Sequence, residues 1–243
     1  MTIAAANRQD HDYNGPFPSV SVVIPTLNEA HNLPHVLPLV QDHYEVIVVD
    51  GGSTDGTMDV AREIRPSATV MRQPRKGKGD ALFAGFAAAS GEIIVTLDAD
   101  GSQKPSEIER FVGALIGGAD FVKGSRLVDG GGSVDFTWVR AAGNRALGMT
   151  ANALHGTSYT DITYGYNAFW RSCLPHIVTD HAGFEGEVIM CIRAARAGLR
   201  TSEVPCYEEQ RIHGDSNLNA WRDGWKIFRL IVSLRGSEAV AAG

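Results

Sequence analysis

The chain has 243 residues, of which 44% are hydrophobic and 21% charged, and its formal net charge is −6. This length fits one globular domain with a sizeable core. The acidic balance argues against a general nucleic-acid-binding protein. The sequence lacks the run of about 18 apolar residues that a membrane span requires.

Residues 1–18 are polar and lack a basic start followed by an apolar run, so they predict a disordered tail, not a secretory signal. The three cysteines, Cys173, Cys191 and Cys206, show no CxxC spacing. This predicts reduced thiols instead of a disulfide framework or a zinc site. Together these features favour a cytoplasmic protein.

Short apolar strands alternate with helices along the first half of the chain. Strands are predicted at 19–24, 46–49, 68–71, 92–97 and 119–122, and helices at 33–40, 55–64, 80–89 and 105–116. We expect Asn28 and Asp55 to cap the first two helices. This alternation predicts an α/β fold, with βαβ units, a mostly parallel sheet and helices on both of its faces.

Ligands of such sheets bind beyond the carboxyl ends of the strands. Four loops there are rich in Asp, Gly, Ser or Lys, at 25–29, 50–57, 75–78 and 98–104. After residue 122 the pattern changes to a glycine loop at 130–132, a helix at 138–154, a β-rich stretch at 161–170, a helix at 185–197 and a strand at 199–207.

Asp98 and Asp100 lie two residues apart, just after the fourth strand. Alternate residues of extended backbone point the same way, so both carboxylates can converge. Mg²⁺ and Mn²⁺ prefer such oxygen ligands. A metal held there would neutralise the diphosphate of a nucleotide sugar. The pair alone is weak evidence, because an Asp in a surface turn can instead cap the next helix.

Four segments together are more specific than this pair. They read V-S-V-V-I-P-T-L-N-E at 20–29, V-I-V-V-D-G-G-S-T-D-G-T at 46–57, K-G-K-G-D-A-L-F-A-G-F-A-A-A at 76–89 and I-I-V-T-L-D-A-D-G-S-Q-K at 93–104. In this order and spacing they resemble family 2 inverting glycosyltransferases of the GT-A fold. The resemblance is strongest to the branch that transfers sugars to dolichyl or polyprenyl phosphate, and it extends over 20–235.

The resemblance implies a nucleotide-sugar-binding α/β/α sandwich with a mostly parallel central sheet. It would consist of a donor half at 19–124 and an acceptor half at 125–218, followed by an amphipathic helix and tail at 219–243. The implied donor-binding residues are Pro25, Leu27, Glu29, Asp50, Lys78, Asp98 and Ala99. Asp50 could instead form a turn before two glycines, and Lys78 could be a solvated lysine.

Asp98 and Asp100 are the implied metal ligands. The prenyl-phosphate branch often has a Gln two residues past the second Asp. Here Ser102 occupies that place and Gln103 is beside it, which leaves open whether a third protein ligand exists.

Resemblance to the acceptor half assigns Arg126, Arg140 and Arg211 to phosphate, which a guanidinium can bind bidentately. Each could instead be a surface arginine in an ion pair. The implied catalytic residues are Asp100, Arg126, Glu185 and Glu187. The two glutamates begin a predicted helix, where they could favour the helix dipole or serve as a general base. A hydroxyl acceptor needs a base, whereas an ionised phosphate can attack without one.

The C-terminal segment 219–235 carries aromatic and basic residues at helical spacing, with Trp221, Trp225, Phe228 and Val232 on one stripe. It predicts peripheral contact with an anionic membrane, on the cytoplasmic face, or else a helix packed on the core. The predicted function is metal-dependent transfer of mannose or glucose, from a GDP- or UDP-sugar to a polyprenyl phosphate. A soluble hydroxyl acceptor is the alternative.

Overall fold

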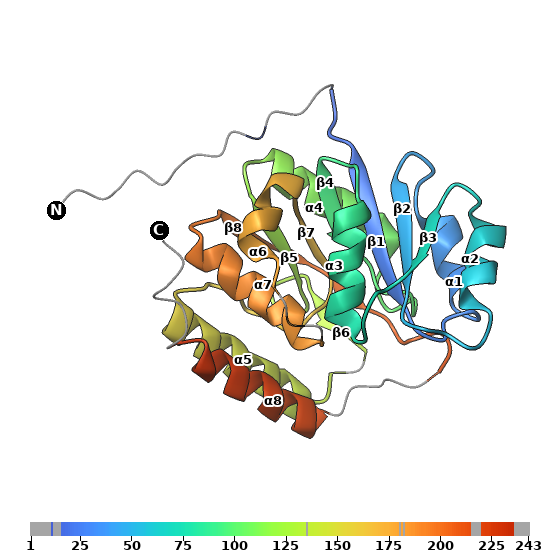
Figure 1. Ribbon diagram of the computed structural model, residues 1–243. Coiled ribbons are helices and arrows are strands. Elements are labelled where there is room, and N and C mark those ends of the chain that lie inside the picture. The colour runs from blue at the N-terminus through green and yellow to red at the C-terminus, as the bar shows by residue number, and fades with distance from the viewer. Residues whose placement is uncertain are drawn as a thin grey trace.

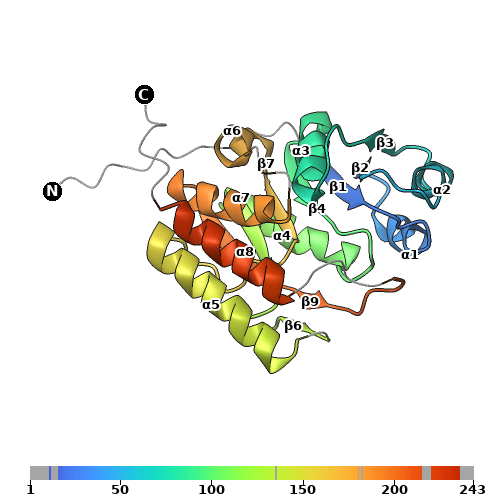
Figure 2. The ribbon, with the colours of Figure 1, turned by 60° about the horizontal axis from the view of Figure 1, so that its bottom comes forward.

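The computed structural model describes residues 11, 16–134, 136–179, 181, 183–214 and 220–235. Its centre is a seven-stranded sheet in the order β3-β2-β1-β4-β7-β5-β8. In Figures 1 and 2, α3 (Lys78–Ala88) and α7 (Glu185–Arg196) cover one face of the sheet and α4 (Ile108–Ile116) covers the other. The predicted α/β architecture is therefore confirmed.

The strands of the sheet share one direction except for β7, which runs antiparallel between β4 and β5. Their bounds are β1 Val20–Thr26, β2 Glu45–Asp50, β3 Thr69–Arg72, β4 Ile93–Thr96, β5 Phe121–Ser125, β7 Asn167–Trp170 and β8 Thr201–Pro205. A second, two-stranded sheet pairs β6 (Gly132–Ser133) with β9 (Tyr207–Glu208). The remaining helices are α1 Leu33–Val36, α2 Thr57–Ile64, α5 Trp138–His155, α6 Leu174–Ile177 and α8 Ala220–Ser233, with 3₁₀ turns at Leu37–Leu39, Pro105–Glu107 and Arg171–Cys173.

The strands β1, β2 and β4 consist almost entirely of buried residues. Apolar, β-branched runs of this kind suit strands that are covered on both faces. The parallel register pairs Thr26 with Asp50, so the carboxyl ends of β1 and β2 meet at one edge of the sheet. The loop after β4 leaves the sheet at the same edge, which brings three of the predicted site loops together.

The local capping predictions were partly wrong. Asn28 does not cap α1: it adopts a left-handed conformation with φ 58°, and its side chain accepts a hydrogen bond from the Thr54 amide. Asn and Asp tolerate this conformation better than most residues. The N-cap of α1 is Asn32. Asp55 does accept a hydrogen bond from the Thr57 amide at the start of α2, although Gly56 occupies the N-cap position.

Helices α5 and α8 lie side by side at the edge of the sheet where the site loops gather (Figures 1 and 2). Burial of Ile227 and Ile231 attaches α8 to the protein, and the carbonyl of Ile231 bonds the His155 ring at the end of α5 over 2.8 Å. In the part of the chain that the structure describes, no helix is both long and apolar enough to cross a membrane.

Most of the predicted N-terminal tail, along with residues 236–243, lies outside the described residues. His11 is described, and its ring stacks on Trp170 with a centroid separation of 4.8 Å. His11 Nε2 also lies 2.7 Å from Asp120 Oδ1. This one residue of the predicted tail is therefore packed against the folded domain.

Candidate active site

The centre of the candidate site is the loop that follows β4, where Asp98 and Asp100 are braced by the two residues after them. Gln103 accepts a hydrogen bond from the Asp98 amide over 2.9 Å and donates to Asp98 Oδ2 over 3.0 Å. Ser102 donates to Asp100 Oδ1 from its amide and from its hydroxyl, over 2.9 and 2.7 Å. Both carboxylates are thus held in place while remaining partly accessible.

This bracing bears on the open question of a third metal ligand. Gln103 is buried, and both polar atoms of its amide are used on Asp98. The Ser102 hydroxyl is turned toward Asp100. In this conformation the two side chains therefore act as supports that orient the carboxylates, the usual role of residues just outside a set of metal ligands.

Lys78 and Glu187 meet Asp98 on its other side. Lys78 Nζ lies 2.7 Å from Asp98 Oδ1 and 3.2 Å from Glu187 Oε2. Burial lowers the pKa of Lys78, but attraction to Asp98 and Glu187 outweighs burial, so its pKa is raised overall. From the sequence, Lys78 could also be a solvated surface lysine. The structure instead places its side chain, mostly buried, between two carboxylates.

Glu187 is buried, and its Oε1 atom has no hydrogen-bond partner within the described ranges. Burial raises the pKa of Glu187, with the charge of Lys78 opposing that shift and the charge of Asp98 adding to it. A Cβ added at Gly165 would lie 2.9 Å from Lys78 Nζ, 3.1 Å from Asp98 Oδ2 and 3.2 Å from Glu187 Oε1. A side chain at this position would crowd the three groups, so glycine suits the place where they converge.

Arg211 links the second carboxylate to the loop after β1. Its guanidinium lies 3.0 Å from Asp100 Oδ2 and 3.1 Å from Glu29 Oε1. Burial raises the pKa of Glu29, against the lowering effects of Asn32 and Arg211. The segment that carries Arg211 is fixed to the Asp98–Asp100 loop because the Ile212 amide donates to the Asp100 carbonyl over 3.0 Å.

Asp50, at the end of β2, forms the turn considered from the sequence and keeps one oxygen without a protein partner. Its Oδ2 atom accepts hydrogen bonds from the amides of Gly52 and Ser53 over 2.9 and 3.0 Å, as a turn former does. Its Oδ1 atom is buried and has no partner in the described part of the chain. Such an orphaned acceptor is costly unless a ligand donates to it.

The other predicted donor residues differ in accessibility. Pro25 is half-buried at the end of β1, and Leu27 is exposed in the loop that follows. Ala99 is buried between the two aspartates.

Arg126 is engaged by acidic side chains. Its Nε atom lies 2.7 Å from Asp161 Oδ2, and its Nη1 atom lies 3.0 Å from Glu208 Oε2. The guanidinium carbon is also 4.6 Å from the ring centroid of Tyr164 and 4.5 Å from that of Phe136. Two carboxylates and two rings leave little of this side chain for a phosphate, which favours a structural role.

Three further predicted residues lie apart from Arg126. Arg140 is exposed in the first turn of α5, where its amide donates to the Thr137 N-cap. Glu185 forms a 2.9 Å ion pair with Lys226 of α8 and is not part of the carboxylate cluster, by which we mean Asp98, Asp100 and Glu187. Of the two glutamates, only Glu187 contacts the groups beside Asp98.

The residues present fit a hard divalent cation. Asp98 and Asp100 offer carboxylate oxygens at an accessible loop. Water and substrate phosphate usually fill the remaining coordination positions of such a cation. No cluster of three or more His, Cys, Asp or Glu with metal-binding geometry occurs among the described residues.

Sequence reasoning missed three residues that shape the site. The resemblance points to Ser102 and not to Gln103 as the place of a third metal ligand, and it implies no role for Asp161 or Glu208. Asp161 lies in the T-D-I-T segment, and its lone carboxylate among apolar and aromatic residues was the available signal. Glu208 gave none, because its relation to Arg126 exists only after folding.

Comparison with known proteins supports the interpretation of the fold. The glycosyl transferase family 2 model matches residues 21–189. Undecaprenyl-phosphate mannosyltransferase of Micrococcus luteus is 36% identical over 213 residues, which is 82% of this chain and 87% of that protein. Polyprenol monophosphomannose synthase of Mycolicibacterium smegmatis is 33% identical over 212 residues, which is 82% of this chain and 80% of that protein.

Among solved structures, the chain is similar to glucosyl-3-phosphoglycerate synthase from Mycobacterium tuberculosis in complex with Mn²⁺, UDP-glucose and phosphoglyceric acid. The TM-score is 0.69 with 26% sequence identity, over 90% of this chain and 79% of that one. A mostly parallel sheet with an acidic loop at its carboxyl edge thus defines a glycosyltransferase of the GT-A fold. The chain belongs to glycosyl transferase family 2.

Proposed function

We propose that this glycosyltransferase moves a single hexose, mannose or glucose, from a GDP- or UDP-sugar to a polyprenyl phosphate, with inversion and with Mg²⁺ or Mn²⁺. The names of two relatives, an undecaprenyl-phosphate mannosyltransferase and a polyprenol monophosphomannose synthase, support this acceptor. The UDP-glucose and Mn²⁺ bound to the similar glucosyl-3-phosphoglycerate synthase support a nucleotide-sugar donor and a divalent metal.

In the proposed reaction an oxygen of the acceptor phosphate forms a bond to the anomeric carbon. The bond from that carbon to the donor diphosphate breaks, and the nucleoside diphosphate departs with the electron pair. An ionised phosphate monoester has no proton to lose, so this step needs no base. Attack opposite the leaving group inverts the anomeric centre.

Asp98 and Asp100 would hold the metal, which when bound supplies positive charge to the diphosphate as it leaves. Ser102 and Gln103 keep these two carboxylates oriented. Lys78 lies beside Asp98, so its ammonium would add a fixed positive charge near the leaving group.

The nucleoside would lie over the loops after β1 and β2. Glu29 and the unpaired Oδ1 atom of Asp50 are carboxylate acceptors for N–H or O–H groups of the base and ribose. Pro25 and Leu27 would provide an apolar edge. Arg211 would hold phosphate once released from Glu29 and Asp100, and exposed Arg140 would approach the acceptor side.

The observation that carries this proposal is the braced pair Asp98 and Asp100, with Lys78 on the first carboxylate and Arg211 on the second. The direct test is a panel of nucleotide sugars incubated with a short prenyl phosphate and Mg²⁺ or Mn²⁺, with the product mass read out. Addition of one hexose to the prenyl phosphate is expected for one donor. No product from any donor would overturn the proposed acceptor.

A second candidate is transfer to a soluble hydroxyl. It is favoured by the likeness to glucosyl-3-phosphoglycerate synthase, whose complex contains phosphoglyceric acid. Buried Glu187, with one unpaired oxygen beside Asp98, is the candidate to take the proton from that hydroxyl. Glu185 is less suited, since it pairs with Lys226 away from the cluster.

Glu187→Gln separates the two candidates. Loss of a general base typically costs about 10²–10⁴-fold in rate. A phosphate acceptor should keep much more of the wild-type rate, because no proton transfer accompanies its attack. Glu63→Gln, which removes an exposed carboxylate from α2, is the matched control and should leave either reaction within about threefold of wild type.

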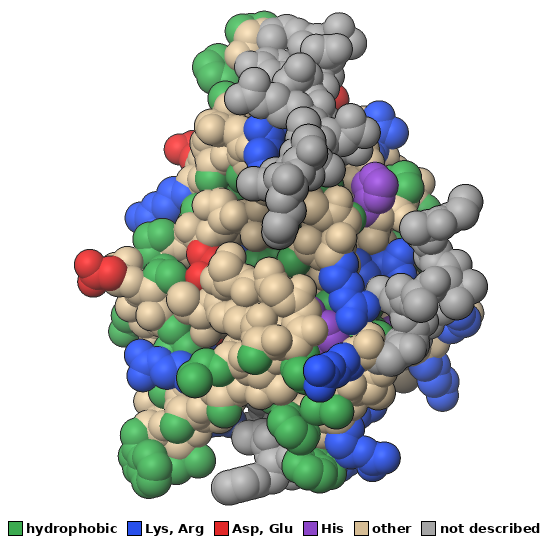
Figure 3. Space-filling model, turned by 90° about the vertical axis from the view of Figure 1, so that its left-hand side faces the viewer, with side chains coloured by type: hydrophobic (Ala, Val, Ile, Leu, Met, Phe, Trp, Pro, Cys, Tyr) green, Lys and Arg blue, Asp and Glu red, His purple; other side chains and the backbone are tan. Residues whose placement is uncertain are grey.

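The proposal includes peripheral contact with a membrane surface, which would bring the enzyme to a lipid acceptor. Helix α5 contains two arginines and no carboxylate, and α8 contains three cationic residues and one aspartate. Trp138 and Met149 of α5 and Trp225 of α8 are exposed. A basic surface with exposed apolar side chains suits an anionic bilayer. In Figure 3 such hydrophobic side chains gather at the lower edge of a face on which Lys and Arg are prominent.

A further inference from the structure

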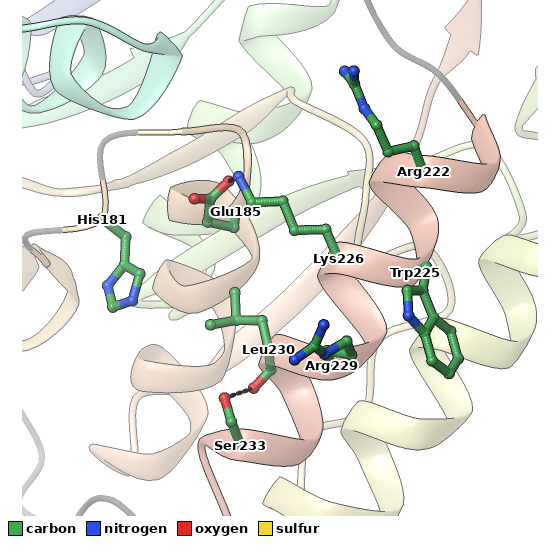
Figure 4. Close-up of a pocket in the computed structure, with 8 residues that line it drawn as sticks. All are labelled: His181, Glu185, Arg222, Trp225, Lys226, Arg229, Leu230 and Ser233. Carbon is green, nitrogen blue, oxygen red and sulfur yellow. Dashed lines mark hydrogen bonds and ion pairs between the residues drawn. The ribbon is translucent and has the colours of Figure 1, made fainter.

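A groove of about 410 Å³ lies between α8 and the residues that begin α7 (Figure 4). Its lining is rich in cationic groups and contains one carboxylate. The lining residues are His181, Glu185, Arg222, Trp225, Lys226, Arg229, Leu230 and Ser233. The charge of this groove contrasts with the net charge of −6 on the whole chain.

The cationic residues form one stripe along α8. Arg222, Lys226 and Arg229 are spaced by four and three residues, so they follow one another on the same side of the helix. Lys226 extends across the groove to Glu185, with an Nζ–Oε2 distance of 2.9 Å (Figure 4). Arg229 forms no ion pair with any residue in the described ranges. Glu185 pairs with Lys226 and Asp223 lies 3.4 Å from Arg222, so the three cations of this stripe exceed the two carboxylates beside them by one.

The groove adjoins the carboxylate cluster. Glu185 lines the groove, while Glu187, two residues further on, contacts Lys78 in the candidate active site. Phe184 directly precedes Glu185, and its ring centroid lies 6.0 Å from Lys78 Nζ. Less than one helical turn thus separates a residue of the groove from a residue that contacts Lys78.

The groove also has an apolar side. Trp225 is 62% exposed and stacks on Phe228 with a centroid distance of 5.4 Å. Leu230 adds a further apolar surface. A ligand that matches both parts carries an anionic group at one end and a hydrocarbon chain at the other.

We propose that this groove binds the phosphate group of a prenyl phosphate acceptor through Arg222, Lys226 and Arg229, with the first isoprene units against Trp225. This inference rests on the proposed function for its choice of acceptor. Arg126, assigned to phosphate from the sequence, is held by Asp161 and Glu208. Charge-assisted contacts from α8 would add cations for the acceptor phosphate.

The test is a titration of the wild-type protein with a short prenyl phosphate, without any donor. Binding is monitored through the change in tryptophan fluorescence, to which Trp225 contributes. Trp225→Phe identifies the part of the signal that comes from the groove. The double variant Arg222→Gln/Arg229→Gln should weaken binding by at least about tenfold, because two charge-assisted contacts are lost. Arg235→Gln removes an exposed charge just beyond α8, outside the groove, and should bind within about twofold of wild type.

Two ligand controls define the ligand class. The corresponding prenyl alcohol lacks the phosphate, and inorganic phosphate lacks the chain, so both should bind at least about tenfold more weakly than the prenyl phosphate. Unchanged prenyl phosphate affinity in Arg222→Gln/Arg229→Gln would overturn the proposal. Equal affinity for inorganic phosphate would overturn the assignment to a lipid-linked acceptor. Circular dichroism of each variant confirms that it is folded.

The design separates this inference from the proposed function. Groove binding is measured without a nucleotide sugar, so loss of binding in the double variant supports the groove even when no donor yields product. Conversely, hexose transfer with an unchanged acceptor KM in the double variant would leave the proposed function intact and refute the groove.

Discussion

Replacement of Arg126 by Met tests whether this arginine stabilises the fold or binds a phosphate. Met keeps much of the side-chain volume but removes the charge and every donor. It would leave fully buried Asp161 without its bidentate partner and Glu208 without its ion pair. The structure therefore predicts a large loss of stability.

The magnitude follows from burial. Removal of one partner from a buried ion pair costs about 3–5 kcal/mol, because an uncompensated charge remains. Each kcal/mol lowers the midpoint of thermal unfolding by about 2–4 °C in a chain of this size. Arg126→Met should thus lower the midpoint by roughly 6–20 °C. Arg140→Met changes an exposed arginine and should stay within about 0.5 kcal/mol of wild type.

Thermal unfolding and urea titration at pH 7 provide the measurement. A second replacement, Asp161→Asn in the Arg126→Met background, removes the stranded carboxylate charge and should recover part of the loss, so the two changes are not additive. The reasoning is refuted if Arg126→Met unfolds within about 2 °C of wild type. A raised acceptor KM with unchanged stability would then assign Arg126 to phosphate binding.

Three further predictions concern other parts of the molecule. Gln103→Leu removes both hydrogen bonds that brace the first metal-site carboxylate and should lower transfer by about 10–100-fold with little change in unfolding; wild-type turnover would show that the brace is dispensable. Burial raises the pKa of Glu187, so folding favours its protonated form. This contribution to the stability of the protein is complete below the pKa of an unfolded glutamate, about 4.3, and is lost as the pH rises through the raised pKa of the folded state. Glu187→Gln should accordingly be at least as stable as wild type at pH 7, with no advantage near pH 4, and a less stable variant at pH 7 contradicts this sign. Trp138→Ser/Trp225→Ser should lose sedimentation with vesicles that contain anionic lipid, while Ile116→Ser, exposed elsewhere, keeps it; equal sedimentation of all three proteins would remove the membrane contact.

The fold was largely predictable from local sequence. The Val- and Ile-rich strands are buried on both faces, so each one is a continuous apolar run in the sequence. These runs are separated by segments with helical spacing, which makes the βαβ pattern visible. Parallel strands then bring their carboxyl ends to one edge, which placed Asp50 and the Asp98–Asp100 loop together. The antiparallel strand β7 was not distinguished, because its four buried residues carry no directional signal.

The partners within the site were not predictable, because folding brings them together from distant positions. Asp161 lies 35 residues from Arg126, and Glu208 lies 82 residues from it. A sequence pattern shows that Arg126 is cationic and follows a strand, but it does not show which acids neutralise it. The same limit applies to Glu187, whose contact with Lys78 joins the starts of two helices remote in sequence.

Helix α8 illustrates a different limit. Its sequence offers two apolar stripes, and periodicity cannot decide which one packs. The structure buries Ile227 and Ile231 and leaves Trp225 and Val232 exposed. The predicted packing of this helix on the core is therefore confirmed for one face, and contact of its exposed face with a membrane stays a prediction.

The measurement that tests the central claim most directly is hexose transfer to a short prenyl phosphate by wild-type protein, Asp98→Ala and Asp100→Ala. Each is assayed with the active donor, with Mg²⁺ or Mn²⁺ and again with a chelator. Asp59→Ala, which removes a highly exposed carboxylate from α2, is the matched control. We expect metal-dependent product from wild type and Asp59→Ala, and loss of at least about 100-fold in the two site variants. Full activity of Asp98→Ala or Asp100→Ala, or undiminished transfer in the chelator, would contradict this claim.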